Sequence, residues 1–249
     1  MVIIYICIFF LGSALASYIN ATIYRIEKKI KYPEILTRSS QCEKCKKKLT
    51  WYELIPVFGY ILIRGRCPKC KEKINIYYPL SELFLGTSFI LLYLTGAPFY
   101  IWIVLILLFI LSFYDILYRA IPRSLVHILI LISIPIFIFF NYNLPSLIIT
   151  ASILLFLFIL TLILKKSFGL GDILILLGLG LILSLKEYLV MFWISIFSAL
   201  LYAILNGVIQ KKSMKKVKIP MVPFFAFAFL IASIWGEGIF EYIFSLILL

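Results

Sequence analysis

Long runs of apolar residues recur along almost the whole chain and limit what it can fold into more than any other feature. Hydrophobic residues make up 64% of the sequence, whereas soluble domains contain roughly 45–50%. A helix of about 17–25 apolar residues crosses a bilayer, where every backbone polar group has to be paired within the segment. We therefore predict an all-α polytopic membrane protein with about eight transmembrane helices, near residues 1–24, 79–96, 99–117, 124–141, 144–164, 171–185, 187–209 and 219–235.

The two ends of the chain are the least regular parts of this pattern. The run at 1–24 has neither a basic start nor a small-residue cleavage site, so we interpret it as a retained span rather than a signal peptide. Residues 236–249 form an apolar remainder that the pattern does not place.

The net charge of +13 is distributed in a way that indicates topology. If the N-terminus lies outside, all but one (Lys186) of the 24 Lys and Arg residues fall in cytosolic segments, as the positive-inside rule requires. This distribution argues for contact with membrane lipids and against nucleic-acid binding. It predicts a multi-pass protein of the cytoplasmic membrane with its N-terminus outside.

One polar insertion divides the chain into a first span (1–24), a cytosolic loop (25–78) and a multi-span part (79–249). The loop contains the apolar stretch LIPVFGYILIRG, which is too short to cross a membrane. We expect this stretch to form a short hairpin or to lie on the membrane surface.

The loop also holds four of the five cysteines, in the pairs Cys42/Cys45 and Cys67/Cys70. Two C-x-x-C knuckles at this separation can place four thiolates tetrahedrally around Zn²⁺. Four thiolates leave no position open for water, so the predicted zinc ion is structural. Lysines beside the knuckles would offset the negative charge of the centre; they are Lys44, Lys46, Lys47, Lys69 and Lys71. Unligated thiols or a redox pair are the alternative.

The only two aspartates, Asp115 and Asp172, adjoin apolar runs. An ionisable side chain at membrane depth is a candidate functional residue by default. The charge-derived topology brings both to the cytosolic side, near the end of one span and the start of another. Two neighbouring carboxylates share a proton, so that one acts as base and the other as acid. We predict an aspartic peptidase centre; the alternative is that each aspartate caps a helix or pairs with Arg119 or Lys166.

The glycines of GLGD support this hypothesis. Gly169 and Gly171 allow unusual backbone angles and let a substrate strand approach Asp172 closely. Helix dipoles further predict Asp172, near a helix N-terminus, as the base and Asp115, near a C-terminus, as the acid. Asn20 and Asn206, within spans, are expected to form interhelical hydrogen bonds.

Taken together, these segments resemble the type IV prepilin peptidase family, the bifunctional leader peptidases and N-methyltransferases of bacterial pilus and type II secretion systems. The resemblance covers nearly the whole chain. Its segments are FLGSALASYINATIYRI, the cysteine loop through YYPLSELF, DILYRAIP, GLGDILIL and IPMVPFFAF.

The resemblance implies removal of the basic leader of prepilins or pseudopilins at the cytosolic face of the bacterial inner membrane. It also implies N-methylation of the new N-terminus with S-adenosylmethionine. By motif position, Asp115 and Asp172 match the catalytic aspartates, and the four cysteines match the zinc ligands. Departures from the family pattern are Leu117, Leu174 and Val222, which leave both aspartates in place.

The methyltransferase half rests on the resemblance alone, since no Gly-rich dinucleotide-type site occurs in the sequence. Candidate residues for it are Arg64, Arg66 and Glu82, whose alternative roles are headgroup contact and interhelical pairing. Two other functions stay open from the residues: a GxGD intramembrane protease of other substrates, and a cation-coupled transporter with the aspartates as ion sites.

Overall fold

The computed structural model describes residues 1–140, 144–164, 169–210 and 219–247. The chain divides into two compact units, Met1–Gly96 and Ala97–Leu249. The links at 165–168 and 211–218, which carry several of the lysines used in the topology prediction, lie outside the described residues.

The first unit is built on two long antiparallel helices, α1 (Val2–Glu27) and α4 (Tyr77–Leu94). They pack closely because glycines face the partner helix: a Cβ at Gly12 would lie 2.7 Å from the carbonyl oxygen of Leu85. In lipid the hydrophobic effect does not drive helices together, so helix association depends on close packing, which small residues permit. The Asn20 amide donates to Ser81 Oγ at 2.7 Å, which confirms the interhelical bond expected of Asn20.

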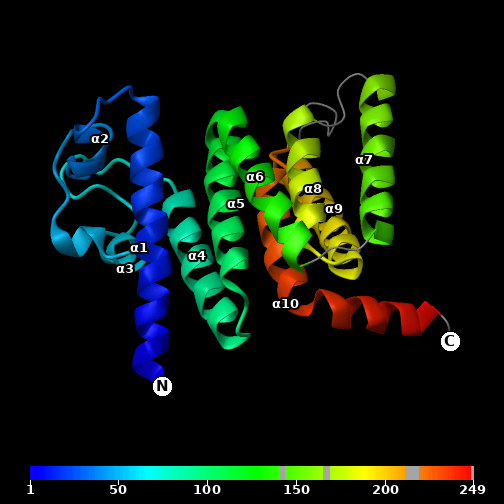
Figure 1. Cartoon of the computed structure of the whole chain (residues 1–249). Coiled ribbons are helices and arrows are strands. Elements are labelled where there is room, and N and C mark those ends of the chain that lie inside the picture. The colour runs from blue at the N-terminus through cyan, green and yellow to red at the C-terminus, as the bar shows by residue number, and fades with distance from the viewer. Residues whose placement is uncertain (141–143, 165–168, 211–218, 248–249) are drawn as a thin grey trace. The chain divides into compact units, whose positions relative to one another are not determined.

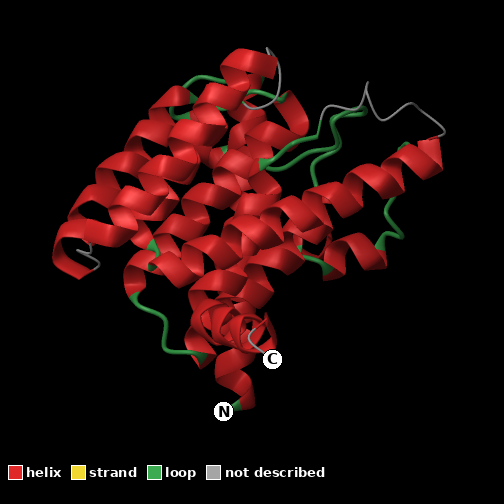
Figure 2. Ribbon diagram, turned by 90° about the vertical axis from the view of Figure 1, so that its right-hand side faces the viewer, coloured by secondary structure: helices red, strands yellow, loops and turns green. Residues whose placement is uncertain are grey.

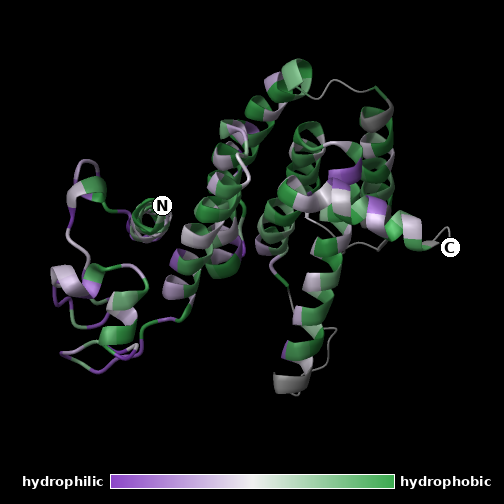
Figure 3. Ribbon diagram, turned by 90° about the horizontal axis from the view of Figure 1, so that it is seen from below, coloured by the Kyte–Doolittle hydropathy of each residue, from purple (hydrophilic) through white to green (hydrophobic). Residues whose placement is uncertain are grey.

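Three short helices interrupt the loop between α1 and α4. They are α2 (Glu34–Thr37), the 3₁₀ helix η1 (Trp51–Leu54) and α3 (Phe58–Leu62). Figure 1 shows this loop, in blue and cyan, folded beside α1 rather than extending away from it. Figure 3 shows that the loop mixes polar and apolar segments.

The second unit contains the remaining helices: α5 (Phe99–Tyr118), α6 (Arg123–Phe140), α7 (Leu144–Leu164), α8 (Leu170–Ile182), α9 (Leu185–Gln210) and α10 (Val222–Ile247). Helix α10 packs against α5 and α9, and α8 packs against α6 and α7. The interior is formed by fully buried side chains, among them Leu108, Leu111, Phe113, Leu176, Phe225 and Phe229. For the part of the chain that the structure describes, Figure 2 shows helices joined by loops and turns.

The architecture is all-α and polytopic, as predicted. Each predicted apolar run coincides with a helix, and within the described residues five of these helices are long and apolar enough to cross a membrane. The tail that the sequence pattern could not place continues α10 to Ile247. Figure 1 shows a bend in this helix, and Gly236 and Gly238 in the WGEG sequence account for it, because closely spaced glycines weaken a helix locally.

Candidate active site and metal centre

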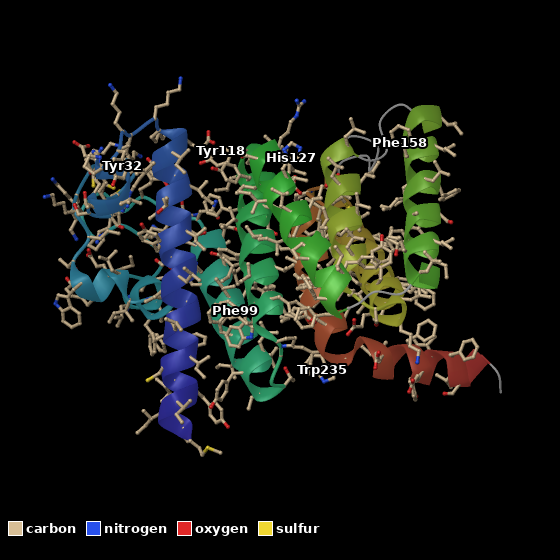
Figure 4. All side chains as sticks on the ribbon, in the orientation of Figure 1. Tyr32, Phe99, Tyr118, His127, Phe158 and Trp235 are labelled. Atoms are coloured by element: carbon tan, nitrogen blue, oxygen red, sulfur yellow. The ribbon has the colours of Figure 1, made fainter. Side chains whose placement is uncertain are left out.

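Three helix ends meet at one end of the Ala97–Leu249 unit. They are the C-terminus of α5 and the N-termini of α8 and α10 (Figure 1). Tyr118 and His127 mark this end in Figure 4, and Phe99 and Trp235 mark the opposite end. Both aspartates singled out in the sequence lie at the first of these ends.

Asp115 lies in the last turn of α5 and is half-buried. Its Oδ2 accepts the backbone N–H of Val222 at 3.0 Å, and the N–H of Met221 also interacts with the carboxylate. These donors are free because the first N–H groups of a helix have no intrahelical partner. Arg119, the left-handed residue that ends α5 (φ 51°), adds a favourable positive charge nearby. The carboxylate is therefore held by the start of α10.

Asp172 is the third residue of α8 and is also half-buried. Gly169, in extended conformation, is the N-cap, and its N–H donates to Asp172 Oδ2 at 3.2 Å. In a capping box, the N3 side chain accepts the N–H of the N-cap residue, as Asp172 does here. The reciprocal bond, from the N3 N–H to the N-cap side chain, cannot form because glycine has no side chain. The carboxylate thus lies at the exposed start of α8, beside a backbone with no side chain to block it.

The negative charge of Asp115 acts on Asp172, so the two carboxylates lie in the same region of the unit. Gly171 lets the start of α8 pack closely on the segment that follows α5, since a Cβ there would lie 3.1 Å from Ile121 Cδ1. The end of α5 and the start of α8, which carry the two aspartates, therefore pack close together.

The helix-end argument for different roles of the two aspartates loses its basis in this geometry. Asp172 does lie at a helix N-terminus, since α8 begins at Leu170. However, Asp115 also faces a helix N-terminus, that of α10, whose Val222 N–H points at it. Backbone N–H groups therefore stabilise negative charge on both carboxylates.

The four cysteines of the loop converge as predicted. The sulfur atoms of Cys42, Cys45, Cys67 and Cys70 lie within 4.8 Å of one another. Cys42 Sγ is 3.7 Å from Cys70 Sγ, and Cys45 Sγ is 3.8 Å from Cys67 Sγ. Four sulfurs bound at about 2.3 Å to a tetrahedral ion are about 3.8 Å apart, so the cluster has the dimensions of a metal centre.

The two knuckles have the same backbone hydrogen bonds. In the first, Cys42 N–H donates to Lys47 and Lys46 N–H donates to Cys42. In the second, Cys67 and Lys71 repeat this pattern with Glu72 and Cys67 as acceptors. Lys46 and Lys71 occupy equivalent left-handed positions, with φ of 57° and 58°. The cluster is therefore formed by two copies of one turn facing each other.

The thiol pKa values of the second knuckle shift in opposite directions. N–H groups of Cys70 and Lys69 donate to Cys67 and lower the pKa of its thiol to about 6, whereas desolvation and the neighbouring thiols raise the pKa of Cys70 to about 11. The thiolate is the form that binds metal, so Cys67 is the thiol best prepared for it. Two of the lysines expected to balance the charge are paired instead with acids of the loop, Lys44 with Glu72 and Lys47 with Glu53.

The candidate methyltransferase residues occupy different environments. Arg64 and Arg66 are exposed on the loop beside the second knuckle. Glu82 is buried on α4, where it accepts the N–H of Val57 at 2.7 Å and interacts with the hydroxyl of Ser17. Glu82 therefore has a structural partner in the loop.

The backbone donors of Met221 and Val222 were missed by residue-level reasoning, because no side-chain pattern marks a main-chain donor. The available signal was Pro220 and Pro223, which flank them in IPMVPFFAF. Proline lacks an N–H and favours the first helical turn, so the two residues between the prolines are the ones with free donors.

Two family descriptions match the chain, one in each compact unit. Residues 10–95 match the bacterial peptidase A24 N-terminal domain, and residues 102–204 match the type IV leader peptidase family. No solved structure gives a significant match.

The chain is similar to proteins named prepilin leader peptidase/N-methyltransferase. Identity is 36% over 86 residues to that of Vibrio cholerae (32% of this chain, 34% of the relative) and 30% over 125 residues to that of Klebsiella pneumoniae (47% and 55%). The Bacillus subtilis protein is 26% identical over 220 residues, 84% of this chain and 86% of the relative. The aligned region thus covers about a third of the Vibrio protein, about half of the Klebsiella protein and most of the Bacillus protein.

The paired aspartates, the cysteine cluster, the polytopic helices and both family matches agree with one another, and we conclude that the chain belongs to the type IV leader peptidase family.

Proposed function

We propose that the protein is a membrane aspartic endopeptidase that removes the basic leader of type IV prepilins or pseudopilins, with Asp115 and Asp172 as its catalytic pair. The observation that carries the proposal is that both carboxylates lie at one end of the second unit, where each accepts a hydrogen bond from a backbone N–H group at the start of a helix. One carboxylate takes a proton from water as the water oxygen attacks the scissile carbonyl, and the other, protonated, donates its proton to the carbonyl oxygen. When the C–N bond breaks, the first group passes the proton taken from water to the leaving amine, and the second recovers its own proton as the carbonyl forms again.

The exposed glycine edge of α8 fits a peptide substrate. Gly169 is exposed and extended, so that no side chain covers the backbone beside Asp172. An extended substrate strand can lie along it without a side-chain clash. The charge-derived topology would place this edge at the cytosolic face, where a basic leader remains after its apolar helix has inserted.

We further propose that the Met1–Gly96 unit carries a structural zinc ion and takes part in S-adenosylmethionine-dependent N-methylation. The sulfur geometry supports zinc, held by Cys42, Cys45, Cys67 and Cys70 with no open position. Methylation is supported by the names of the relatives alone.

The test is co-expression of the protein with a prepilin and mass spectrometry of the pilin N-terminus, which reports cleavage position and methyl addition together. We expect Asp115→Asn and Asp172→Asn each to slow cleavage by at least about 10³-fold, because each removes one partner of the proton transfer. Glu187→Gln is the matched control, since it neutralises a half-buried carboxyl group at the start of α9, outside the pair.

Intact leader removal in both asparagine variants would exclude the peptidase mechanism. Loss of ion uptake in the same variants, with no cleavage by the unmodified protein, would favour a cation-coupled transporter. Cleavage within an apolar helix rather than before it would favour an intramembrane protease.

A further inference from the structure

The apolar part of the cysteine loop lies beside the middle of α1. The Phe58 ring, at the start of α3, stacks on the Phe10 ring with centroids 6.1 Å apart. Phe10 precedes Arg25, the first charged residue of α1, by about 22 Å along the helix axis. A bilayer has a hydrocarbon core about 30 Å thick. If α1 spans it, Phe58 lies at the level of the hydrocarbon core and not at the aqueous surface.

The outward surface of this segment is apolar. No charged residue occurs between Glu53 and Arg64, and Glu53 itself is buried and paired with Lys47. The exposed large side chains are Trp51, Tyr52, Leu54, Phe58, Ile61 and Leu62. They continue the exposed apolar surface of α1, on which Leu11 is 64% exposed. Since α1 faces lipid as a membrane helix, the adjoining surface has the same surroundings.

Several backbone groups of the segment are paired within the protein, which lowers the cost of burial in lipid, where unpaired N–H and C=O groups are costly. It is compact: a Cβ at Gly59 would lie 2.4 Å from the carbonyl oxygen of Glu53, so α3 packs directly on the backbone of η1. Gly59 N–H bonds to Ile55 and Ile63 N–H bonds to Gly59.

The turn between η1 and α3 is strained and is held from α4. Val57 has φ 63° and ψ −52°, and the Phe58 N–H bonds to the Pro56 carbonyl at 2.7 Å, which makes this a γ-turn in its rare positive-φ form. A β-branched residue adopts such angles only when its surroundings require them. Glu82 supplies the constraint, because its Oε2 accepts the Val57 N–H at 2.7 Å.

We propose that residues 51–62 form a re-entrant segment, inserted from the cytosolic side among the acyl chains beside α1, and that Glu82 is the positioning residue that anchors its turn. The cysteine loop is then held in the membrane rather than suspended above it. This inference is independent of the proposed catalytic activity and rests only on the membrane placement of α1.

The experiment measures the depth of single tryptophans in the full-length, zinc-loaded protein reconstituted into phosphatidylcholine vesicles with brominated acyl chains. All four native tryptophans are replaced by Phe, and one Trp is then introduced at Ile61, Leu11 or Tyr32. Ile61 and Leu11 are 63% and 64% exposed, so they are matched in exposure, and Tyr32, 79% exposed, lies in the polar part of the loop. Bromine quenches only tryptophans within the acyl region, and acrylamide reports aqueous access.

We expect Ile61→Trp to be quenched by brominated lipid as strongly as Leu11→Trp and to be shielded from acrylamide, whereas Tyr32→Trp shows the opposite behaviour. Glu82→Leu should shift Ile61→Trp towards the Tyr32→Trp values, and Glu82→Gln, which retains an acceptor for the Val57 N–H, should not. Because the main comparison uses native Glu82, it stands even if Glu82→Leu fails to fold. Quenching of Ile61→Trp at the Tyr32→Trp level would overturn the proposal. The proposal would also be overturned if acrylamide quenched Ile61→Trp and only an added pilin helix protected it, since the surface would then be a protein-docking site.

Discussion

The four cysteines lie in one loop, at most 28 positions apart, whereas Asp115 and Asp172 lie on separate helices with α6 and α7 between them. The cysteine cluster is formed by two copies of one turn, whose hydrogen bonds are local. Asp115 and Asp172 come together only because α5 ends where α8 and α10 begin. The cysteine cluster can therefore be predicted from the spacing of the cysteines in the sequence. The approach of the two aspartates depends on helix packing, which sequence spacing does not specify. The two centres should respond differently to perturbation.

Removal of the metal should have the largest effect, and it should be confined to the cysteine region. Structural Zn²⁺ contributes about 10–16 kcal/mol to the folding of small zinc domains. We expect a strong chelator, or Cys67→Ser, to remove one equivalent of zinc, measured by mass spectrometry of the metal, and to expose the loop to protease. Cys7→Ser, outside the cluster, should keep the metal. Equal protease sensitivity in the Ala97–Leu249 unit would show that the centres are not independent.

Gly171→Val should affect the aspartate pair without touching the metal. The added side chain would meet Ile121, 3.1 Å from the new Cβ, and would displace the start of α8. A misplacement of about 1 Å can cost about 10²-fold in rate, so we expect a loss of that order in pilin cleavage with zinc content unchanged. Combining it with Ile121→Ala should restore part of the activity; additive losses in the double variant would argue against this contact as the cause.

Gly12→Ala tests helix packing in the first unit at a distance from either centre. The added methyl group would lie 2.7 Å from the Leu85 carbonyl oxygen, and overpacking of this kind costs about 1–3 kcal/mol. We expect a lower thermal unfolding midpoint in detergent, with metal content retained. Gly238→Ala is the control, because nothing lies within 4 Å of its added Cβ. An unchanged midpoint for Gly12→Ala would mean that α1 and α4 are not so tightly packed.

The smallest expected effect is the difference in stability contributed by two ion pairs of the cysteine loop. Lys44 and Glu72 are both exposed, whereas Lys47 pairs with the buried Glu53. Exposed pairs contribute little, while removal of one partner of a buried charge leaves that charge uncompensated. We expect Lys44→Ala to leave the zinc affinity and thermal midpoint unchanged and Lys47→Ala to lower the midpoint. The reverse order would show that the exposed pair, not Glu53, orders the first knuckle.

Much of this fold could be predicted from the chain because lipid imposes simple rules. The apolar runs located each long helix, since only a helix satisfies its own backbone in hydrocarbon. Lysine and arginine positions assigned Asp115 and Asp172 to the same side, because charge asymmetry determines which ends of the helices are cytosolic. The doubled C-x-x-C spacing predicted the cysteine cluster, since each knuckle is local.

The rest depended on contacts that residue identity does not specify. The Val222 N–H that holds Asp115 belongs to the backbone, and its direction follows from the placement of α10. The continuation of α10 through Gly236 was missed because two glycines resemble the end of a helix. The partner of Glu82 was missed because Val57 N–H becomes available only through an uncommon turn.

The equivalence of the two cysteine turns also affects how this protein can be engineered. The Leu49 N–H bonds to Ser40 beside the first turn, and the Ile74 N–H bonds to Gly65 beside the second. The segment between residues 49 and 65 therefore starts beside the first cysteine turn and ends beside the second. Such an arrangement tolerates exchange of the intervening stretch, so chimaeras that take residues 51–62 from other family members should keep their thiolate ligands while acquiring a different hydrophobic insert.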